Sequence, residues 1–222
     1  MSKRKPYIVA LSGGSGSGKS TLSSAIVDRL GRDTVVLFHE DAYYWPRDHY
    51  PESMQASAIN YDHPASKDTE FLVRDLETLK RGEPIEQPVY DYALHDRSTT
   101  ETRKISPARI VLLEGIHTLS IPGTEHLIDF KVYVDTPDDL RLARRIRRDV
   151  AERGRELEGV LSQYMNTVRP AHYEHTFPAK FVADLVIADE GLPAFGDVRP
   201  SEAAIERMLA PVLDRLQSAG VV

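Results

Sequence analysis

A run of glycine and serine residues near the N-terminus has the clearest chemical meaning in this chain. It fits the pattern G-x-x-x-x-G-K-[ST], which folds as a phosphate-binding P-loop between a strand and a helix. Glycines permit tight turns that aim backbone N–H groups at an anion, and the helix adds the positive end of its dipole. Lys19 would then reach the β- and γ-phosphates of a nucleotide, and the Ser20 hydroxyl would join the ligands of a Mg²⁺ ion. The predicted phosphate-binding residues are Gly13, Gly14, Ser15, Gly16, Ser17, Gly18, Lys19, Ser20 and Thr21.

Two carboxylates are expected at the edge of the predicted sheet where this loop lies. Asp41 follows the predicted strand Thr34–Phe38, and Glu114 ends the predicted strand Ile110–Leu113. Ligands of open α/β sheets bind beyond the carboxyl ends of the strands. Asp41 could therefore accept a proton from an attacking hydroxyl or hold Mg²⁺ through water, and Glu114 could lie near Mg²⁺. The alternatives are a helix cap or surface turn for Asp41 and a surface carboxylate for Glu114.

An arginine-rich segment is the second strong signal. Seven arginines and only two acids, Asp149 and Glu152, occur from Arg141 to Arg155. Four of the arginines are spaced to share one helix face: Arg141, Arg144, Arg145 and Arg148. Another face carries three apolar residues that are expected to pack: Leu142, Ile146 and Val150. Because Gly154 would break the helix, we expect residues 141–160 to form a lid whose arginines close over a phosphate chain. A solvated charged face is the alternative.

The alternation of strand-like and helix-like segments predicts a three-layer α/β fold. Five apolar runs predict a parallel sheet: Tyr7–Leu11, Thr34–Phe38, Ile110–Leu113, Lys131–Val134 and Asp184–Ala188. The predicted helices are Thr21–Leu30, Asp68–Arg81, Pro137–Glu152 with Thr136 as its N-cap, and Ser201–Leu216. Residues 83–108 predict an inserted β-hairpin, and Gly191–Pro200 predicts a linker to the last helix. We interpret residues 1–222 as a single domain.

The composition limits the classes of function. The 222 residues carry a net charge of −6, which does not favour nucleic-acid binding. The absence of cysteine excludes disulfides and cysteine-ligated zinc. No segment predicts a membrane span or a signal peptide, so a cytoplasmic protein is expected. His172 and His175 lie three residues apart, but no third ligand follows by spacing, and we interpret them as surface or helix-end residues.

Several further motifs make the chain resemble the uridine kinase (uridine–cytidine kinase) family, within the phosphoribulokinase/uridine kinase group of P-loop kinases. Order and spacing agree over about residues 6–188, and several blocks are specific to the family rather than to P-loops in general. The matching segments are Gly13–Thr21, Asp41–Tyr44, Asn60–Pro64, Pro88–Tyr92 with His95 and Arg97, Leu113–Ile116, Arg144–Asp149, Arg153–Arg155 and Ser162–Tyr164.

The resemblance implies ATP- or GTP-dependent phosphorylation of the 5′-hydroxyl of a pyrimidine ribonucleoside, with Mg²⁺, in pyrimidine salvage. It also implies roles that are transferred by position in the motifs. The implied catalytic residues are Asp41 as the base, Lys19, and the lid groups Arg148 and Arg153. The implied substrate-binding residues are Asp62 at the ribose, Tyr90 and His95 at the base, and Tyr44, Arg145, Arg155 and Gln163 around the nucleoside. The implied Mg²⁺ environment is Ser20, Glu114 and Asp41.

The chemistry of these residue types agrees with the transferred roles. A carboxylate such as Asp62 can accept two hydrogen bonds from a cis-diol, which would select ribose over 2′-deoxyribose. A neutral imidazole has one donor and one acceptor nitrogen, so His95 could meet either uracil O4 or the cytosine amino group. Tyr90 offers an aromatic face to the base. From the residues alone, a turn cap for Asp62 and hairpin packing for Tyr90 stay open.

Two other functions and one departure from the family pattern also stay open. A phosphoribulokinase, or another small-molecule kinase of the group, would not need an aromatic hairpin. A non-catalytic nucleotide sensor is expected to lack Asp41 or Glu114, and both are present. Asp189–Gly191 replaces the proline-containing, basic stretch expected there, so the choice between ATP and GTP is open. The resemblance suggests a homotetramer, and we expect no nucleic-acid or membrane partner.

Overall fold

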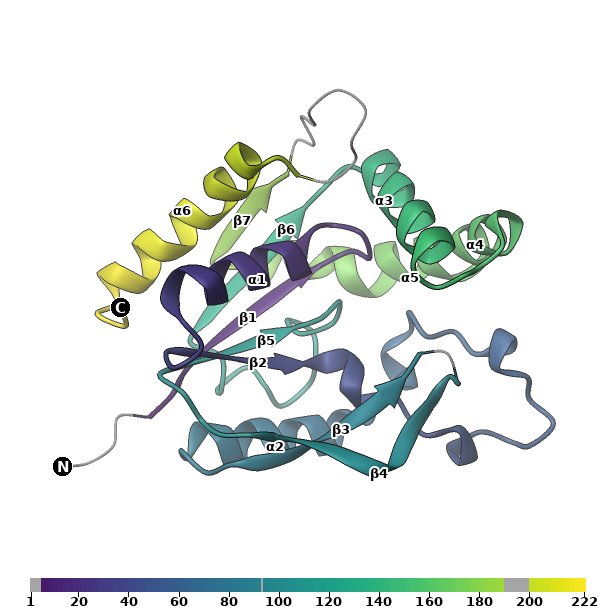
Figure 1. Ribbon diagram of the computed structural model, residues 1–222, viewed down its shortest axis with the longest axis horizontal. Helices are drawn as coiled ribbons and strands as arrows, with labels where there is room; N and C mark the ends of the chain where they lie inside the picture. Colours follow the sequence, from purple (N-terminus) through teal and green to yellow (C-terminus); the bar gives the residue numbers. More distant parts are fainter. Residues whose placement is uncertain (1–4, 93, 190–199) are drawn as a thin grey trace.

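A five-stranded parallel sheet forms the centre of the molecule (Figure 1). The computed structural model describes residues 5–92, 94–189 and 200–222. The strand order is β2-β5-β1-β6-β7, and each neighbouring pair is parallel. The strands are β1 Tyr7–Gly13, β2 Val35–His39, β5 Ile110–Glu114, β6 Phe130–Asp135 and β7 Leu185–Ala188. The five predicted strands are therefore confirmed, with small shifts at their ends.

Helices cover both faces of the sheet, because alternate residues of each strand point to opposite sides. Helices α1 (Lys19–Leu30) and α6 (Glu202–Ser218) pack on one face, and α2 (Thr69–Lys80) packs on the other. The first core cluster includes Val9, Leu11, Leu22, Ile26, Leu209 and Val212. The second core cluster includes Ile8, Ala10, Phe38, Leu72, Leu76 and Leu113. The predicted three-layer α/β fold is confirmed.

A β-hairpin and an irregular segment extend from one end of the sheet (Figure 1). Strands β3 (Ile85–Asp91) and β4 (Asp96–Ile105) pair antiparallel as a separate two-stranded sheet. Their register shifts between Pro88 and Tyr90, where proline has no N–H to continue the ladder. Short helical turns punctuate the segment between β2 and α2: η1 Glu40–Tyr43, η2 Arg47–His49, η3 Ala56–Ala58 and η4 Pro64–Ser66.

Two helices project from the other side of the same end of the sheet. They are α3 (Asp138–Ala151), which follows β6, and α4 (Leu157–Gln163), and Figure 1 shows them opposite the hairpin. A helical stretch with π- and 3₁₀-turns returns the chain to β7. Its parts are η5 Tyr164–Val168, α5 Arg169–Ala171, η6 His172–Thr176 and η7 Phe177–Val182.

Two predictions about α3 are wrong. Pro137 rather than Thr136 occupies the N-cap, and the Thr136 hydroxyl donates instead to the Ser17 carbonyl oxygen at 2.8 Å. The predicted apolar face is not the buried one, since Val150 is 41% exposed. The buried residues of α3 are Arg141, Arg145 and Asp149. Helix α3 packs its charged face against the P-loop, because hydrogen bonds and ion pairs satisfy the buried charges there.

Two segments that the sequence marked lie largely outside the described residues. In the predicted linker Gly191–Pro200, only Pro200 belongs to the described residues, and Glu190 and Gly191 of the departing segment lie outside them. Throughout the described ranges, no helix combines the length and apolar character needed to cross a membrane.

Candidate active site

The predicted phosphate-binding loop joins β1 to α1. Gly16 and Gly18 have φ angles of 80° and 88°, in the left-handed region that favours glycine. A Cβ atom at Gly16 would lie 2.5 Å from the Arg141 carbonyl oxygen, so α3 crosses the loop where only glycine fits. Lys19 starts α1 and is 9% exposed. The open N–H groups of the first helical turn and this ammonium together suit a polyphosphate.

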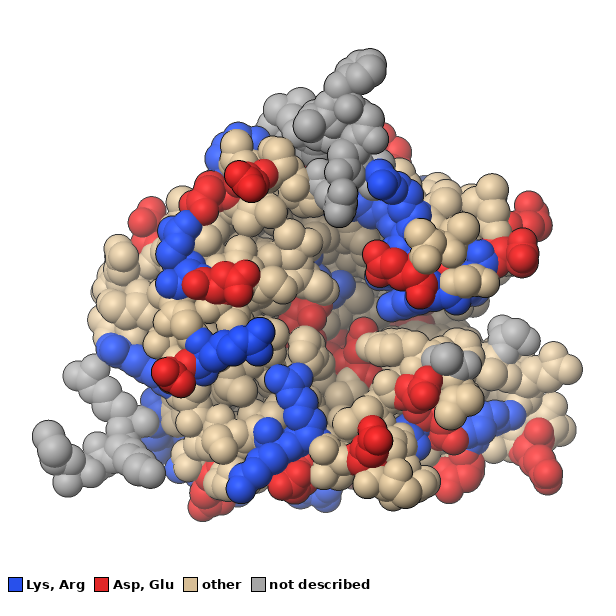
Figure 2. Space-filling model, in the orientation of Figure 1, with Lys and Arg blue, Asp and Glu red and all other residues tan. Residues whose placement is uncertain are grey.

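A cavity of about 380 Å³ opens beside the loop, between the hairpin and the α3–α4 segment; we call it the hairpin cavity. Figure 2 shows this side of the molecule hollowed, with acidic side chains in the floor and basic side chains along one wall. Its lining contains these predicted residues: Ser15, Lys19, Ser20, Asp41, Tyr44, Asp62, Tyr90, His95, Glu114, Arg145, Arg148, Arg153, Arg155 and Gln163. It also contains four residues to which no site role was assigned from the sequence, although three of them lie in the family-like segments: His39, Tyr61, Tyr92 and Ile116.

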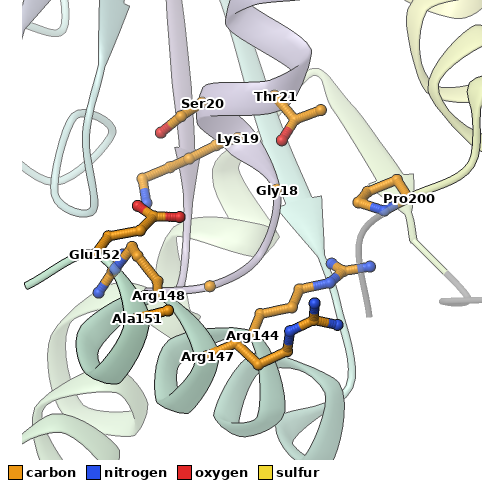
Figure 3. Close-up of a pocket in the computed structure, with 11 residues that line it drawn as sticks. Gly18, Lys19, Ser20, Thr21, Arg144, Arg147, Arg148, Ala151, Glu152 and Pro200 are labelled. Atoms are coloured by element: carbon orange, nitrogen blue, oxygen red, sulfur yellow. The ribbon is translucent and has the colours of Figure 1, made fainter. Parts of the chain in front are cut away.

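A second cavity of about 410 Å³ lies between the start of α1 and α3; we call it the lid cavity (Figure 3). In Figure 3, Lys19 and Ser20 face it from α1, and three α3 arginines lie opposite. The lining consists of Gly16, Gly18, Lys19, Ser20, Thr21, Arg144, Arg147, Arg148, Ala151, Glu152 and Pro200. Three residues line both cavities: Lys19, Ser20 and Arg148. The two cavities therefore meet at the P-loop lysine.

Glu114 lies at the end of β5, where the two cavities join. Its Oε1 accepts a hydrogen bond from the Ser20 hydroxyl at 3.1 Å, and its Oε2 lies 3.3 Å from Nδ1 of His39. Burial would raise the pKa of Glu114, but the His39 hydrogen bond and the Lys19 charge outweigh it and hold the pKa below its ordinary value. A hydroxyl and a carboxylate are ligands that Mg²⁺ accepts, with phosphate oxygens and water completing its shell.

The carboxylate predicted as the base is held by a lysine. Asp41 is in η1, and its Oδ1 accepts a hydrogen bond from Lys67 Nζ at 2.8 Å. The same ammonium lies 2.9 Å from Oε1 of the fully buried Glu40. Desolvation alone would raise the pKa of Asp41. The charge and hydrogen bond of Lys67, together with the charge of Lys19, instead lower this pKa well below its ordinary value. Asp41 is therefore an anion at neutral pH, able to accept a hydrogen bond.

Aromatic rings form one wall of the hairpin cavity. The rings of Tyr44 and Tyr90 lie 5.0 Å apart, and the Tyr61 ring stacks on His95 at 5.3 Å. His95 has a φ of 52°, in the turn between β3 and β4. Partial burial, together with the charges of Arg155 and Arg153, lowers the pKa of His95, which keeps its imidazole neutral at pH 7. Tyr90 both packs in the hairpin and lines the cavity.

Asp62 reaches the same cavity from the segment before η4. The cap of that turn is His63, whose Nδ1 accepts a hydrogen bond from the Ala65 N–H at 3.0 Å. His63, and not Asp62, therefore caps the turn. Desolvation of its carboxylate raises the pKa of Asp62. The positive charges of Arg145 and Lys67 oppose this rise without cancelling it.

The arginine wall of the hairpin cavity is organised around one acid. Asp149 is fully buried, and its carboxylate pairs with four guanidinium groups. The nitrogen–oxygen distances are 3.6 Å to Arg145, 2.8 Å to Arg148, and 3.4 Å to both Arg153 and Arg155. Burial would raise the pKa of Asp149, but these charges, Arg148 first, lower it. The sequence showed Asp149 among the arginines without giving it this role.

Gln163 ties the lid arginines together, and Tyr92 links them to the hairpin. The Gln163 Oε1 accepts hydrogen bonds from Arg145 at 2.9 Å and Arg155 at 2.7 Å. Arg145 also donates to the Ser15 hydroxyl at 3.0 Å, which joins the lid to the P-loop. The Arg153 guanidinium lies 5.1 Å from the centre of the Tyr92 ring.

The predicted arginine face divides between several tasks. Arg141 lines neither cavity: it donates to the Thr136 carbonyl oxygen at 3.1 Å and pairs with Asp138. Arg144 pairs with Asp189 at 2.6 Å beside the lid cavity. The interpretation of His172 as a surface or helix-end residue is wrong. The residue is 7% exposed, its ring lies behind the P-loop against Gly14, and burial lowers its pKa to about 4.

Comparisons with known proteins give a consistent result. The model of the Phosphoribulokinase / Uridine kinase family matches residues 8–191. The chain is 40% identical over 215 residues to a uridine kinase of Ligilactobacillus salivarius, covering 97% of this chain and 96% of that protein. It is 44% identical over 189 residues to a uridine kinase of Latilactobacillus sakei subsp. sakei, covering 85% and 88%.

Solved structures share the fold at low sequence identity. A phosphoribulokinase from Rhodobacter spheroides superposes with a TM-score of 0.60 at 18% identity, covering 90% of this chain and 76% of that chain. A D-glycerate 3-kinase from Cryptococcus neoformans var. grubii has a TM-score of 0.60 at 17% identity, covering 79% and 80%. With the family model spanning the P-loop, the hairpin and the lid, this chain belongs to the phosphoribulokinase/uridine kinase family.

Proposed function

We propose that this protein is a uridine kinase, which transfers the γ-phosphoryl group of ATP or GTP to the 5′-hydroxyl of uridine or cytidine. The observation that carries the proposal is the junction of the two cavities at Lys19, Ser20 and Arg148. The lid cavity suits the triphosphate of the donor, and the hairpin cavity suits a nucleoside. The γ-phosphoryl group would then be transferred from the donor in the lid cavity to the nucleoside in the hairpin cavity, next to Lys19.

In this mechanism Asp41 accepts the proton of the 5′-hydroxyl as the oxygen attacks the γ-phosphorus. Lys19 binds the phosphates, and Arg148 and Arg153 stabilise the negative charge on the transferring group. Ser20 and Glu114, with Asp41 through water, would hold Mg²⁺, which when bound neutralises charge on the β- and γ-phosphates. The arginine wall closes over the site and excludes water.

The hairpin cavity has groups for both parts of a pyrimidine ribonucleoside. The Asp62 carboxylate can accept hydrogen bonds from the 2′- and 3′-hydroxyls. Tyr90 and Tyr44 supply aromatic contact for the base, and neutral His95 can donate to uracil O4 or accept from the cytosine amino group. Arg145, Arg155 and Gln163 complete the nucleoside site from the lid.

A phosphoribulokinase-like activity is the nearest alternative, and the aromatic wall favours a base-bearing acceptor over a sugar phosphate. An ADP-release assay would compare uridine, cytidine, 2′-deoxyuridine and ribulose 5-phosphate as acceptors. We expect turnover with uridine or cytidine and little with the other two. Turnover with ribulose 5-phosphate alone would overturn the proposal.

We also propose that the protein is a homo-oligomer, a tetramer by its resemblance to the family, and works in the cytoplasm with its nucleotide donor. The exposed Phe181 and Val182, beside the edge strand β7, are 75% and 56% exposed and support self-association. Light scattering on the purified protein tests this: a mass near one chain would contradict it.

A further inference from the structure

A buried lysine lies beneath the hairpin cavity and does not line it. Lys67 is 3% exposed, and its ammonium lies 2.8 Å from Asp41 Oδ1 and 2.9 Å from Glu40 Oε1. It also lies 4.7 Å from the centre of the Tyr44 ring. Lys67 therefore stays outside the lining of the hairpin cavity, yet it contacts Asp41, which is part of that lining.

The backbone fixes the position of this lysine. Tyr44 and Lys67 form an isolated antiparallel bridge. On either side of it, the Trp45 N–H donates to the Ser66 carbonyl at 3.0 Å, and the Asp68 N–H donates to the Tyr43 carbonyl at 2.8 Å. Residues 66–68 are therefore paired with residues 43–45, which follow Asp41.

The Lys67 ammonium and the carboxylates of Asp41 and Glu40 each need the opposite charge of the other. A buried ammonium needs counterions, and two neighbouring carboxylates repel each other unless a cation lies between them. Burial alone would lower the pKa of Lys67, but Asp41 and Glu40 raise it above its ordinary value, so Lys67 stays a cation and is not itself a proton acceptor. With Oδ1 held by Lys67, the other oxygen of Asp41 faces the Tyr92 hydroxyl, 3.5 Å away at the cavity.

Glu40 connects the lysine to the second carboxylate of the nucleoside site. Its Oε2 accepts a hydrogen bond from the His117 N–H at 3.0 Å, and the His117 ring nitrogen lies 2.9 Å from the Asp62 carbonyl oxygen. A Cβ at Gly115 would lie 1.8 Å from Oε2 of Glu40, so glycine leaves the room that this carboxylate occupies. A buried chain of contacts thus joins Asp41, through Lys67 and Glu40, to the segment that carries Asp62.

We propose that Lys67, backed by Glu40, is a positioning residue for phosphoryl transfer: it holds one oxygen of Asp41 and so aims the other at the acceptor hydroxyl. The inference rests on the proposed function and on Asp41 as its base. It predicts that Lys67 acts only through Asp41, so losing Lys67 lowers kcat and leaves substrate binding nearly unchanged.

The test is a double-mutant cycle in a Glu40→Gln background. Glu40→Gln keeps the acceptor for His117 and removes the charge that Lys67→Met would otherwise leave unpaired. We expect Lys67→Met in this background to lower kcat with uridine about 30-fold, which is less than the roughly 10²–10⁴-fold contribution of a general base because Asp41 itself is kept. The KM values for uridine and ATP should change by less than about threefold.

Lys67→Met is then also made in a protein that carries both Glu40→Gln and Asp41→Asn. If Lys67 acts through Asp41, Lys67→Met should lower the residual kcat of that protein by less than about threefold. Equal losses with and without Asp41 would mean a general structural effect and would overturn the proposal, as would an unchanged kcat in a folded Lys67→Met protein. Thermal unfolding checks the fold, and if Met at position 67 unfolds the protein, Lys67→Gln replaces it in the same cycle.

The cycle also separates this inference from the proposed function. A wild-type protein that does not phosphorylate uridine or cytidine contradicts the function itself. A fully active Asp41→Asn protein contradicts the base. If the wild type is active and Asp41→Asn is impaired, then an additive cycle, or an unchanged kcat in the folded Lys67→Met protein, contradicts the role of Lys67 alone.

Discussion

At the scale of single residues, the neighbours of each titratable group decide its charge. Asp41 stays an anion because Lys67 pairs with it, and Glu114 stays an anion because His39 and Lys19 offset its burial. His95 stays neutral because partial burial and nearby arginines disfavour its cation. The site therefore combines a proton acceptor, an anion near the proposed metal position and a neutral ring for the base.

Replacing Asp41 with Asn tests the proton acceptor. We expect kcat with uridine to fall by about 10²–10⁴-fold, since the amide cannot take the proton. ATP affinity should stay nearly unchanged, because Asp41 does not line the lid cavity. ADP release and calorimetric ATP binding measure the two quantities. Asp48→Asn, at an exposed position, is the control, and a wild-type rate in Asp41→Asn would refute the assignment.

Asp62 provides the test of ribose recognition. Asp62→Asn should reduce the preference for uridine over 2′-deoxyuridine, measured as the ratio of kcat/KM values, by about tenfold or more, because the amide presents one acceptor in place of two. The loss should come mainly from the uridine reaction. A preference equal to that of the wild type would place ribose recognition on other residues.

At the scale of elements, the P-loop and the lid depend on each other. The glycine-rich motif predicted the P-loop. The helical spacing of the arginines, followed by Gly154, predicted the lid. The buried face of α3 was mispredicted because a one-dimensional pattern assigns burial to apolar residues. Here the neighbouring P-loop is polar, and Asp149 supplies the counterion that lets arginines be buried. That partner choice depends on tertiary contacts that spacing does not contain.

Gly16 tests the contact between loop and lid. Gly16→Ala and Gly31→Ala both place a Cβ at positive φ, 80° and 85°, and the backbone strain should cost each variant on the order of 1–3 kcal/mol of stability. Among the described residues, only the Gly16 substitution meets a neighbour, the Arg141 carbonyl, since none of their atoms lies within 4 Å of a Cβ at Gly31. We therefore expect Gly16→Ala alone to lose ATP binding in titration calorimetry. Equal affinities in both variants would contradict the described packing.

Asp149 predicts a pH dependence of stability. Its pKa is lowered in the folded protein, so the ionised carboxylate stabilises the fold above its unfolded pKa of about 3.9, and this contribution is lost as pH falls through the folded pKa. The free energy of unfolding of the wild type should exceed that of Asp149→Asn most at neutral pH. The gap should shrink below about pH 4 in urea denaturation. A gap that does not vary with pH would contradict the ion-pair arrangement.

At the scale of the whole molecule, the sheet topology brings distant motifs to one edge. The sequence predicted the five strands and the hairpin range, because periodicity and turn residues are local properties. Its likeness to family motifs also marked most, but not all, of the residues that line the hairpin cavity. It did not predict Lys67, Glu40 or His117 as a connected group. Lys67 meets Asp41 across 26 positions of irregular chain, and no periodicity or charge run marks that contact.

The central claim is that donor and acceptor bind in adjoining cavities that meet at Lys19, Ser20 and Arg148. A crystal structure with uridine, Mg²⁺ and a non-hydrolysable ATP analogue tests it most directly. We expect the triphosphate in the lid cavity and the nucleoside 5′-oxygen within about 3 Å of Asp41, facing the γ-phosphorus. Uridine bound away from the hairpin cavity, or with its 5′-oxygen turned from Asp41, would contradict it.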